Sequence, residues 1–327
     1  LGMILPMTAG ASVYYLRKAP TPQVLLPALI AIRPTAILTV PLIIEKIYKN
    51  KILPNFNKSI VTKILYKFIP TRKFLSRIAG KKLKQTFGGQ LKFFGIGGAK
   101  LDATVERFLK EAKFPYAIGY GLTESAPLLA GSNPQNTILR STGPAMEGVE
   151  LKIHKIDPSL SEGEIWAKGP NVMLGYYKDP ELTKETITKD GWLKTGDLGV
   201  FKNGNLFIKG RSKNMIVGAS GENIYPEEIE GIINNFKYVV ESVVIEKKGK
   251  LVALVHFNYE ELEKKYQHFK DEVTQYVEKR VEELKTELHD YVNKKANKFS
   301  RVQLIVPQPD PFQKTATKKI KRYLYSA

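Results

Sequence analysis

An acidic and a basic side chain flank a short hairpin within Gly191–Lys213. Asp197 lies on a Gly-flanked turn and Arg211 ends the second apolar run, and the Asn203-Gly204-Asn205 turn between the runs predicts a β-hairpin. A hairpin returns the chain on itself, so both side chains can face one ligand. A carboxylate accepts hydrogen bonds from vicinal ribose hydroxyls, and a guanidinium suits ribose or phosphate oxygens. The pair predicts a nucleotide site. A surface ion pair is the alternative that this stretch leaves open.

Two further turns carry residues suited to a nucleotide. Gly97-Gly98-Ala99 follows an apolar run, and small residues there let a flat ligand approach the backbone, although a turn without a ligand is an equal alternative. In the later stretch YGLTES, Tyr120 can stack on a base and the Thr123 hydroxyl can hold a phosphate oxygen. Glu124 can reach a Mg²⁺ ion that bridges phosphates.

The elements around these turns predict an α/β fold. Apolar patterns indicate helix, strand and helix over 23–48, a buried strand over 91–96, and a second strand over 116–119. Asp102 is placed as the N-cap of the helix between the last two strands. Turns at the carboxyl ends of such strands form the usual ligand crevice of α/β folds.

The second half of the chain predicts two further regions. Residues 142–209 alternate in the manner of strands and are interpreted as a small β-barrel-like subdomain. Past Lys213 the patterns change, so we place a domain boundary there. The expected elements are a helix starting near Pro226, two strands joined at Lys248-Gly249-Lys250, one or two helices over 260–299, and a final strand over 302–308.

Composition favours a large globular chain with anionic partners. The 327 residues are 43% hydrophobic and carry a formal net charge of +19, which favours a nucleotide, a coenzyme, an acidic membrane surface or a nucleic acid. The absence of cysteine excludes disulfides, thiol nucleophiles and thiolate metal sites. The apolar opening is too short to span a membrane, and we interpret it as a buried helix end followed by a strand over Ser12–Leu16.

A strongly basic stretch lies between residues 45 and 84. It holds twelve Lys or Arg residues and one acid, Glu45, while Ile60, Ile64, Leu65 and Phe68 are spaced for one helical face. We expect this stretch to touch an anionic bilayer or an acidic partner. A solvated helix packed on its own domain is the alternative.

Several classes of enzyme find no support in the sequence. No Ser/His/Asp order or metal-ligand cluster is apparent, and the four His residues lie outside the turns described above. The GxxxxGK[ST] phosphate loop of Walker-type ATPases is missing. Neither zinc spacing nor a stacking-aromatic signature of nucleic-acid readers occurs, so we expect no nucleic-acid partner.

Six stretches, taken in order, resemble the adenylate-forming superfamily of acyl-CoA synthetases, luciferases and peptide-synthetase adenylation domains. Three features resemble the long-chain fatty-acid–CoA ligase branch in particular: the stretch SGENIYPEEIE, an insert ahead of the Gly97-Gly98-Ala99 turn, and a last motif that reads TATKKIKR. The six stretches are GGAKL (97–101), YGLTES (120–125), GEIWAKGPNVMLGYYKDPELT (163–183), GWLKTGDLG (191–199), GRSKNMIVGASGENIYPEEIE (210–230) and KTATKKIKR (314–322).

The resemblance implies a two-step reaction with ATP, Mg²⁺ and coenzyme A. A fatty acid carboxylate attacks the α-phosphate of ATP and expels pyrophosphate, and a thiol then displaces AMP. The implied roles are adenine binding for Gly97, Gly98, Ala99 and Tyr120, ribose binding for Asp197, ribose or phosphate binding for Arg211, phosphate binding for Thr123 beside Gly121, and Mg²⁺ binding for Glu124. Lys319 aligns with the family's catalytic lysine, although the adjacent Lys318 leaves open which of the two acts.

The resemblance also implies two domains joined by a hinge. Residues 1–141 correspond to the α/β part of the large AMP-binding domain, 142–209 to its β-rich subdomain, 210–213 to the hinge and 214–327 to the small mobile domain. Lys213 aligns with the hinge position, and Gly218, Gly221 and Glu222 are expected to line the thiol entry.

The phosphate loop of the family is missing from the sequence and is expected upstream of Leu1. We therefore expect a fragment that is inactive alone, from a cytoplasmic enzyme with peripheral contact to the inner face of a membrane. The acceptor of the acyl group stays open between coenzyme A and a carrier protein. If it is a carrier protein, the enzyme is an acyl-AMP ligase. From another class, a basic membrane- or nucleic-acid-binding module is the alternative.

Overall fold

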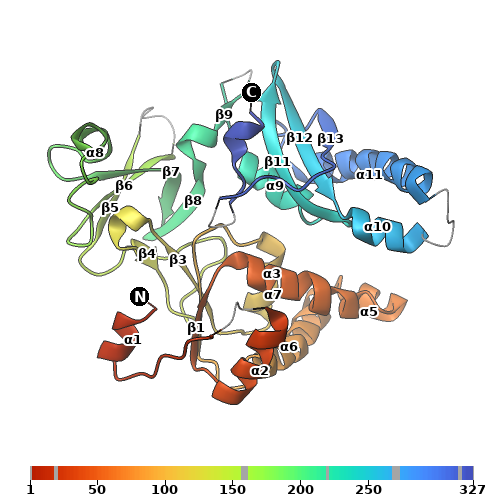
Figure 1. Ribbon diagram of the computed structural model, residues 1–327, viewed down its shortest axis with the longest axis horizontal. Helices are drawn as coiled ribbons and strands as arrows, with labels where there is room; N and C mark the ends of the chain where they lie inside the picture. The colour runs from red at the N-terminus through yellow and green to blue at the C-terminus, as the bar shows by residue number, and fades with distance from the viewer. Residues whose placement is uncertain are drawn as a thin grey trace. The chain divides into compact units, whose positions relative to one another are not determined.

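The computed structural model describes residues 2–17, 21–155, 161–218, 221–266, 273–315 and 319–326. The chain divides into two compact units. The first unit consists of Leu1–Thr195 and Gly199–Ile208, and the second of Gly196–Leu198 and Lys209–Ala327. Figure 1 labels most of the elements of both units.

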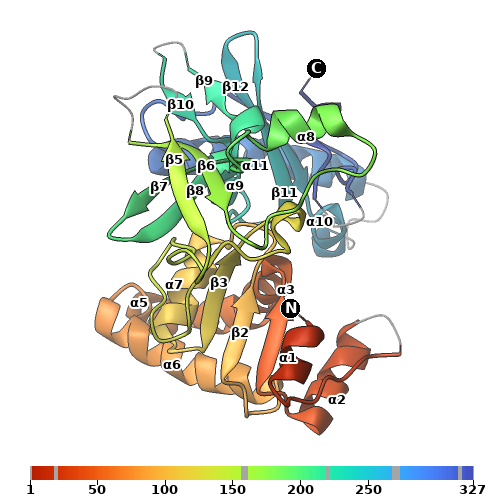
Figure 2. The ribbon, with the colours of Figure 1, turned by 90° about the vertical axis from the view of Figure 1, so that its left-hand side faces the viewer.

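A four-stranded sheet forms the centre of the first unit's α/β part. In sheet order its strands are β1 (Ala36–Thr39), β2 (Phe93–Ile96), β3 (Tyr116–Tyr120) and β4 (Ala130–Gly131). The first three strands are parallel and lie side by side in Figure 2, whereas β4 runs antiparallel to β3. The strands predicted over 91–96 and 116–119 are therefore confirmed.

Helices precede and separate these strands, and several of them bury apolar side chains against the sheet. They are α1 (Ile4–Thr8), α2 (Pro22–Ile32), α3 (Pro41–Ile47), α4 (Leu53–Phe56), α5 (Ile60–Leu65), α6 (Ile69–Thr86) and α7 (Ala103–Glu111), with a π-helical turn over Tyr48–Ile52. Asp102 caps α7 as predicted, because its carboxylate accepts hydrogen bonds from the Thr104 and Val105 amides at 2.8 and 3.0 Å. Rings of Phe87, Phe94 and Phe114 meet in the core beneath, with centroids 5.2 to 6.2 Å apart.

A second four-stranded sheet lies mostly in the first unit, while Gly196–Leu198 and the residues from Lys209 on belong to the second. Its order is β5 (Glu150–His154), β6 (Gly163–Lys168), β7 (Leu193–Lys202) and β8 (Asn205–Arg211), and α8 (Pro180–Thr186) lies between β6 and β7 in the chain. The predicted hairpin is confirmed, since Asn203 and Gly204 both have the positive φ that such a turn requires. The β-rich subdomain expected over 142–209 is present as this sheet, and its described strands form no closed barrel, because β5 and β8 each have one neighbouring strand within it.

Aromatic and basic side chains alternate on one face of this second sheet. Lys152 Nζ lies 3.8 Å from the centroid of the Trp192 ring and 5.0 Å from that of Trp166. The His154 ring stacks on Trp166 with centroids 4.0 Å apart. Ile165 and Ala167 point to the opposite face and are fully buried, as the two-residue period of a strand requires.

The second unit is built on a three-stranded sheet. Strand β11 (Val239–Lys247) pairs antiparallel with β12 (Lys250–Phe257), and β13 (Leu304–Pro307) pairs parallel with β12. The remaining elements are β9 (Ile216–Val217), β10 (Asn223–Ile224), α9 (Pro226–Ile233), α10 (Tyr259–Tyr266) and α11 (Val273–Lys295). Each of the elements predicted after Lys213 is therefore present.

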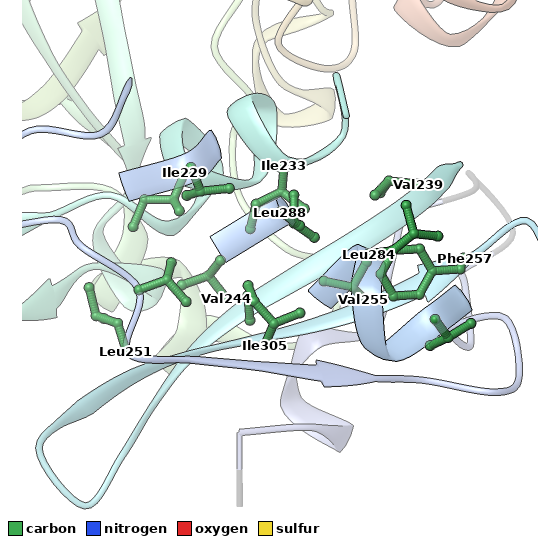
Figure 3. Close-up of a cluster of buried hydrophobic side chains, with 14 of the residues drawn as sticks. Ile229, Ile233, Val239, Val244, Leu251, Val255, Phe257, Leu284, Leu288 and Ile305 are labelled. Carbon is green, nitrogen blue, oxygen red and sulfur yellow. The ribbon is translucent and has the colours of Figure 1, made fainter. Parts of the chain in front are cut away.

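Helices α9 and α11 bury their apolar stripes against this sheet. Figure 3 shows Ile229 and Ile233 of α9 and Leu284 and Leu288 of α11 around the side chains of the sheet. On α11 the buried residues recur every three or four positions, which gives one continuous apolar face (Val277, Val281, Leu284, Leu288 and Val292).

The opening of the chain differs from its prediction. Ser12–Leu16 is not a strand, because it pairs with none of the described strands, and α1 is largely exposed. Among the described residues, no helix has both the length and the apolar character needed to cross a membrane.

Candidate active site

The β7–β8 hairpin brings Asp197 and Arg211 together in the second unit. Arg211 Nε donates to Asp197 Oδ1 at 2.8 Å. Asp197 is 6% exposed, whereas the Arg211 side chain is 40% exposed. The pair is thus partly buried, with its guanidinium open to solvent. A buried carboxylate of fixed orientation beside an accessible guanidinium is suited to hydroxyl and phosphate oxygens.

The Gly97-Gly98-Ala99 turn leaves the carboxyl end of β2 in the first unit. Gly98 has φ +86°, which favours glycine on backbone grounds, while a Cβ there would meet nothing nearer than a Val40 methyl at 3.9 Å. Gly98 and Ala99 are exposed. The turn therefore lies beside open space at the sheet edge where α/β folds bind ligands.

The YGLTES loop leaves the carboxyl end of the neighbouring strand, β3. Tyr120 is 7% exposed and belongs to the cluster of Leu129 and Ile165, so little of its ring is open to a base. Thr123 is exposed and begins a short 3-10 helix, Thr123–Ser125. The hydroxyl of that residue is accessible to a phosphate oxygen.

Glu124 is held by a residue from far along the chain. Its Oε1 accepts a hydrogen bond from the Tyr176 hydroxyl at 2.9 Å, and its backbone carbonyl accepts from the Met173 amide at 2.8 Å. Burial, together with the neighbouring Glu124 carboxylate, raises the pKa of Tyr176, so the phenol stays protonated as a donor.

Two residues that the sequence reasoning missed fix the shape of this loop. The buried Ser125 hydroxyl accepts from the Leu122 amide at 3.0 Å and lies 3.1 Å from the Pro127 carbonyl oxygen. Asn171 Nδ2 donates to the carbonyls of Ser125 and Leu128 at 2.8 and 3.0 Å. The available signal was that both residues lie within family-like stretches, Ser125 in 120–125 and Asn171 in 163–183.

A divalent cation at Glu124 would find few protein ligands. The described residues contain no group of three or more His, Asp or Glu side chains that could hold a metal ion. Mg²⁺ commonly takes one or two carboxylates and completes its shell with phosphate oxygens and water. Glu124 fits that mode of binding, in which the nucleotide supplies most of the ligands.

The remaining predicted residues lie in the second unit. Lys213 occupies the 3-10 turn Ser212–Asn214 directly after β8. Gly218 and Glu222 close the β9–β10 hairpin through a hydrogen bond from the Gly218 amide to the Glu222 carbonyl at 2.8 Å, and Gly221 has φ +81°. Residues 219 and 220 at its tip lie outside the described residues.

Lys319 is exposed at the end of a short loop near the C-terminus. The Thr315 amide donates to the Lys319 carbonyl at 2.8 Å, and the Lys319 amide donates to Thr315 Oγ1 at 3.1 Å. A β-bridge between Lys314 and Ile320 closes the loop. Lys318, the alternative catalytic residue, lies outside the described residues.

A family model named "AMP-binding enzyme" matches residues 1–177, more than half of the chain. The chain belongs to the AMP-binding enzyme family. It is similar to long-chain-fatty-acid–CoA ligase 1 of Saccharomyces cerevisiae, at 33% identity over 204 residues, which covers 60% of this chain and 29% of that protein. It is also similar to a chloroplastic long-chain-fatty-acid–[acyl-carrier-protein] ligase of Arabidopsis thaliana, at 32% identity over 213 residues, with the same two coverages, 60% and 29%.

The fold of this AMP-binding family member has solved counterparts. A structure of o-succinylbenzoate coenzyme A synthetase from Bacillus subtilis, in complex with ATP and magnesium ion, matches with a TM-score of 0.69 at 22% identity. The match covers 97% of this chain and 56% of that one, and it confirms the predicted fold class. The chain spans less than a third of the length of the two curated relatives, 29% of each.

Proposed function

We propose that the chain is part of an ATP-dependent ligase that converts a long-chain fatty acid into an acyl adenylate and then into acyl-CoA, releasing pyrophosphate and AMP. The observation that carries this proposal is the family match together with similarity to relatives that are named as long-chain fatty acid ligases. The exposed turns at the carboxyl ends of β2 and β3 support it, because nucleotides bind α/β sheets there.

In the first step, the predicted site residues bind and orient ATP. The turn of Gly97, Gly98 and Ala99 and the edge of Tyr120 receive the adenine, and Gly121 lets the loop pass close to it. The Thr123 hydroxyl donates to an α-phosphate oxygen, and Glu124 is a ligand for Mg²⁺. Asp197 accepts hydrogen bonds from the ribose hydroxyls, and Arg211 donates to ribose or phosphate oxygens.

Lys319 stabilises the charge that builds up during this displacement. A fatty acid oxygen forms a bond to the α-phosphorus while the bond to the pyrophosphate oxygen breaks. An ammonium between the incoming carboxylate and the α-phosphate gains most as charge accumulates there, and loss of such a contact costs on the order of 10²- to 10³-fold in rate. The Mg²⁺ ion, when bound, neutralises charge on the departing pyrophosphate.

In the second step, the small domain turns and a thiol replaces AMP. We assign 1–141 and 142–209 to the large domain, 210–213 to the hinge around Lys213, and 214–327 to the small domain. Gly218, Gly221 and Glu222 line the thiol entry in this proposal. The thiol sulfur forms a bond to the acyl carbon, and the bond from that carbon to the AMP oxygen breaks.

Acid-dependent pyrophosphate exchange by the full-length polypeptide tests the proposal. With a panel of carboxylic acids from short to long, exchange is expected to be fastest for long-chain fatty acids and to require Mg²⁺. Exchange with short or aromatic acids alone would overturn the assignment of substrate class.

A carrier-protein thiol is a second candidate acceptor. The similarity to a relative named as an acyl-carrier-protein ligase favours it. Full-length enzyme charged with a fatty acid and ATP should be offered coenzyme A or holo-acyl-carrier protein in parallel. Faster release of AMP with one acceptor identifies it.

We also propose that the basic stretch, residues 45–84, makes peripheral contact with an anionic membrane. The enzyme is then cytoplasmic, and the contact is with the inner face of that membrane. Helix α5 and the residues that follow it expose large apolar side chains, among them Ile60 at 78%, Val61 at 64%, Phe68 at 61% and Ile69 at 58%. Lys58, Lys63 and Lys67 interrupt them and are exposed as well. Such a surface matches an interface of lipid tails and acidic headgroups.

Sedimentation with vesicles tests the membrane contact. The full-length protein is expected to bind vesicles that contain phosphatidylserine more than neutral ones, and an Ile60→Glu/Ile64→Glu variant is expected to lose most of that binding. Val240→Glu, which changes a 49% exposed apolar side chain of the second unit, is the control. Equal binding of all three proteins, or no preference for anionic lipid, removes the proposal.

A further inference from the structure

The residues before and after Lys319 in the chain both pack on the second unit. On the near side, Phe312 is 3% exposed and packs with Val243, Ile245 and Val252. On the far side, the Tyr325 ring meets Phe312 edge-on with centroids 4.9 Å apart, and its hydroxyl accepts a hydrogen bond from the Gln313 amide at 2.9 Å. The described residues on either side of the loop are therefore packed on the second unit.

Arg322, in the 3-10 turn after this loop, connects that turn to helix α9 and strand β11. Arg322 Nη2 lies 2.7 Å from Glu230 Oε2 on α9, and Arg322 Nη1 donates to the Val244 carbonyl on β11 at 2.9 Å. The other carboxylate oxygen, Glu230 Oε1, accepts from the Val244 amide at 2.6 Å. The acid and the arginine thus hold each other and both polar groups of one buried strand residue.

The burial of this pair is costly unless both partners stay in place. Burial raises the pKa of Glu230, while Arg322 and the Val244 amide act in the opposite direction. Removal of one partner leaves the other charge in an apolar surrounding, whereas hydrophobic residues could have filled the same space. Stability alone is therefore a weak explanation for the Arg322–Glu230 pair, which indicates that the pair has a further role.

A second acid, Glu241, binds the residues that precede Lys319 in the chain. Glu241 Oε1 accepts from the Phe312 amide at 3.0 Å, and Oε2 lies 2.5 Å from Lys314 Nζ. The Lys314 side chain is 35% exposed, whereas that of Arg322 is 20% exposed. The Arg322 attachment is the more rigid of the two, because it is less open to water and is made through two guanidinium nitrogens.

We infer that Arg322 and Glu230 are positioning residues that hold Lys319, three residues before Arg322, in one orientation relative to α9 and β11, so that its ammonium reaches the α-phosphate in a fixed geometry. This inference rests on the proposed function of Lys319. It is a role in the first half-reaction only, since thioester formation is proposed to proceed with the lysine withdrawn. Misplacement of a reacting group by about 1 Å can cost on the order of 10²-fold in rate.

The test separates the two half-reactions in the full-length enzyme. Arg322→Met is expected to slow acid-dependent pyrophosphate exchange by roughly 10- to 100-fold through kcat, with the KM for ATP nearly unchanged. Thioester formation from supplied acyl adenylate should change less than about threefold. Arg280→Met, which breaks another arginine ion pair of the second unit, to Glu283 and Glu287, is the matched control and should leave both rates unchanged.

A double variant distinguishes positioning from a general loss of structure. In a Lys319→Ala background, Arg322→Met should reduce exchange no further, because both changes remove the same contribution. If Arg322→Met unfolds the enzyme, Arg322→Lys and Glu230→Gln replace it, and Arg322→Lys should recover part of the rate. Equal loss in both half-reactions, or additive losses with Lys319→Ala, overturns the inference. A wild-type enzyme without fatty-acid-dependent exchange instead removes the proposed function itself.

Discussion

Replacing Gly121 by alanine is expected to displace the loop proposed to hold the α-phosphate. An added Cβ would lie 1.5 Å from the Pro127 carbonyl oxygen and 2.6 Å from its carbon. Real Cβ contacts essentially never fall below 3.0 Å, so the two backbone segments must separate by about 3.0 − 1.5 = 1.5 Å. Since the obstacle is backbone, no side-chain rotation can relieve it.

The structure indicates what this separation costs. The Ser125 hydroxyl lies 3.0 Å from the Leu122 carbonyl and 3.1 Å from that of Pro127, so opening the loop breaks at least one of these contacts. Forced packing costs about 1–3 kcal/mol and a lost hydrogen bond about 1 kcal/mol, which together give a stability loss of about 2–4 kcal/mol. A shift of Thr123 by more than 1 Å is expected to slow adenylation on the order of 10²-fold.

Pyrophosphate exchange and urea unfolding of the full-length enzyme measure the two effects. Gly131→Ala on the neighbouring strand β4 is the control, because its Cβ would find its nearest neighbour, the Met146 sulfur, at an acceptable 3.4 Å. That variant should keep wild-type exchange. Exchange by Gly121→Ala within threefold of wild type, with unfolding also unchanged, would refute the reasoning about this loop.

Four further outcomes follow from the same residues. Lys319→Ala should slow adenylation on the order of 10²- to 10³-fold and leave thioester formation from acyl adenylate nearly intact; equal loss of both rates contradicts its role. Lys213→Pro should slow thioester formation more than adenylation, and equal rates count against a hinge there. Leu288→Ala, at a fully buried site, should cost about 2–5 kcal/mol in urea unfolding, whereas a loss below 1 kcal/mol means that the core has been misplaced. Burial raises the pKa of Glu106 above 4.5, so its ionisation opposes folding and stability falls as pH rises above about 4.5; Glu106→Gln should flatten that slope in unfolding followed by circular dichroism.

Local signals in the sequence predicted most of the secondary structure. The Asn203-Gly204 and Lys248-Gly249 turns, the Asp102 cap and the apolar stripe of α11 all depend on neighbours within a few residues, and all are present in the fold. The strand expected over Ser12–Leu16 failed, because a strand also needs a partner that its own residues do not specify.

The sequence could name the candidate site residues but not what holds them. Tyr176 contacts Glu124 across 52 positions, and Arg322 contacts Glu230 across 92. No spacing rule connects residues so far apart, since only the folded chain brings them within hydrogen-bond distance. The sequence could not say whether the β-rich subdomain closes into a barrel for a related reason: alternation along a strand gives its two faces, not the number of its neighbours.

The placement of the two tryptophans makes their fluorescence a probe of the first unit alone. Trp166 and Trp192 are its only two, and both lie in the first unit beside the Lys152 ammonium. Their fluorescence emission will follow the unfolding of the sheet that contains β6 and β7. It will be insensitive to the 23-residue helix α11 of the second unit, which instead contributes strongly to the far-ultraviolet ellipticity. Where the two signals change at different urea concentrations, the gap between the midpoints measures how independently the halves unfold.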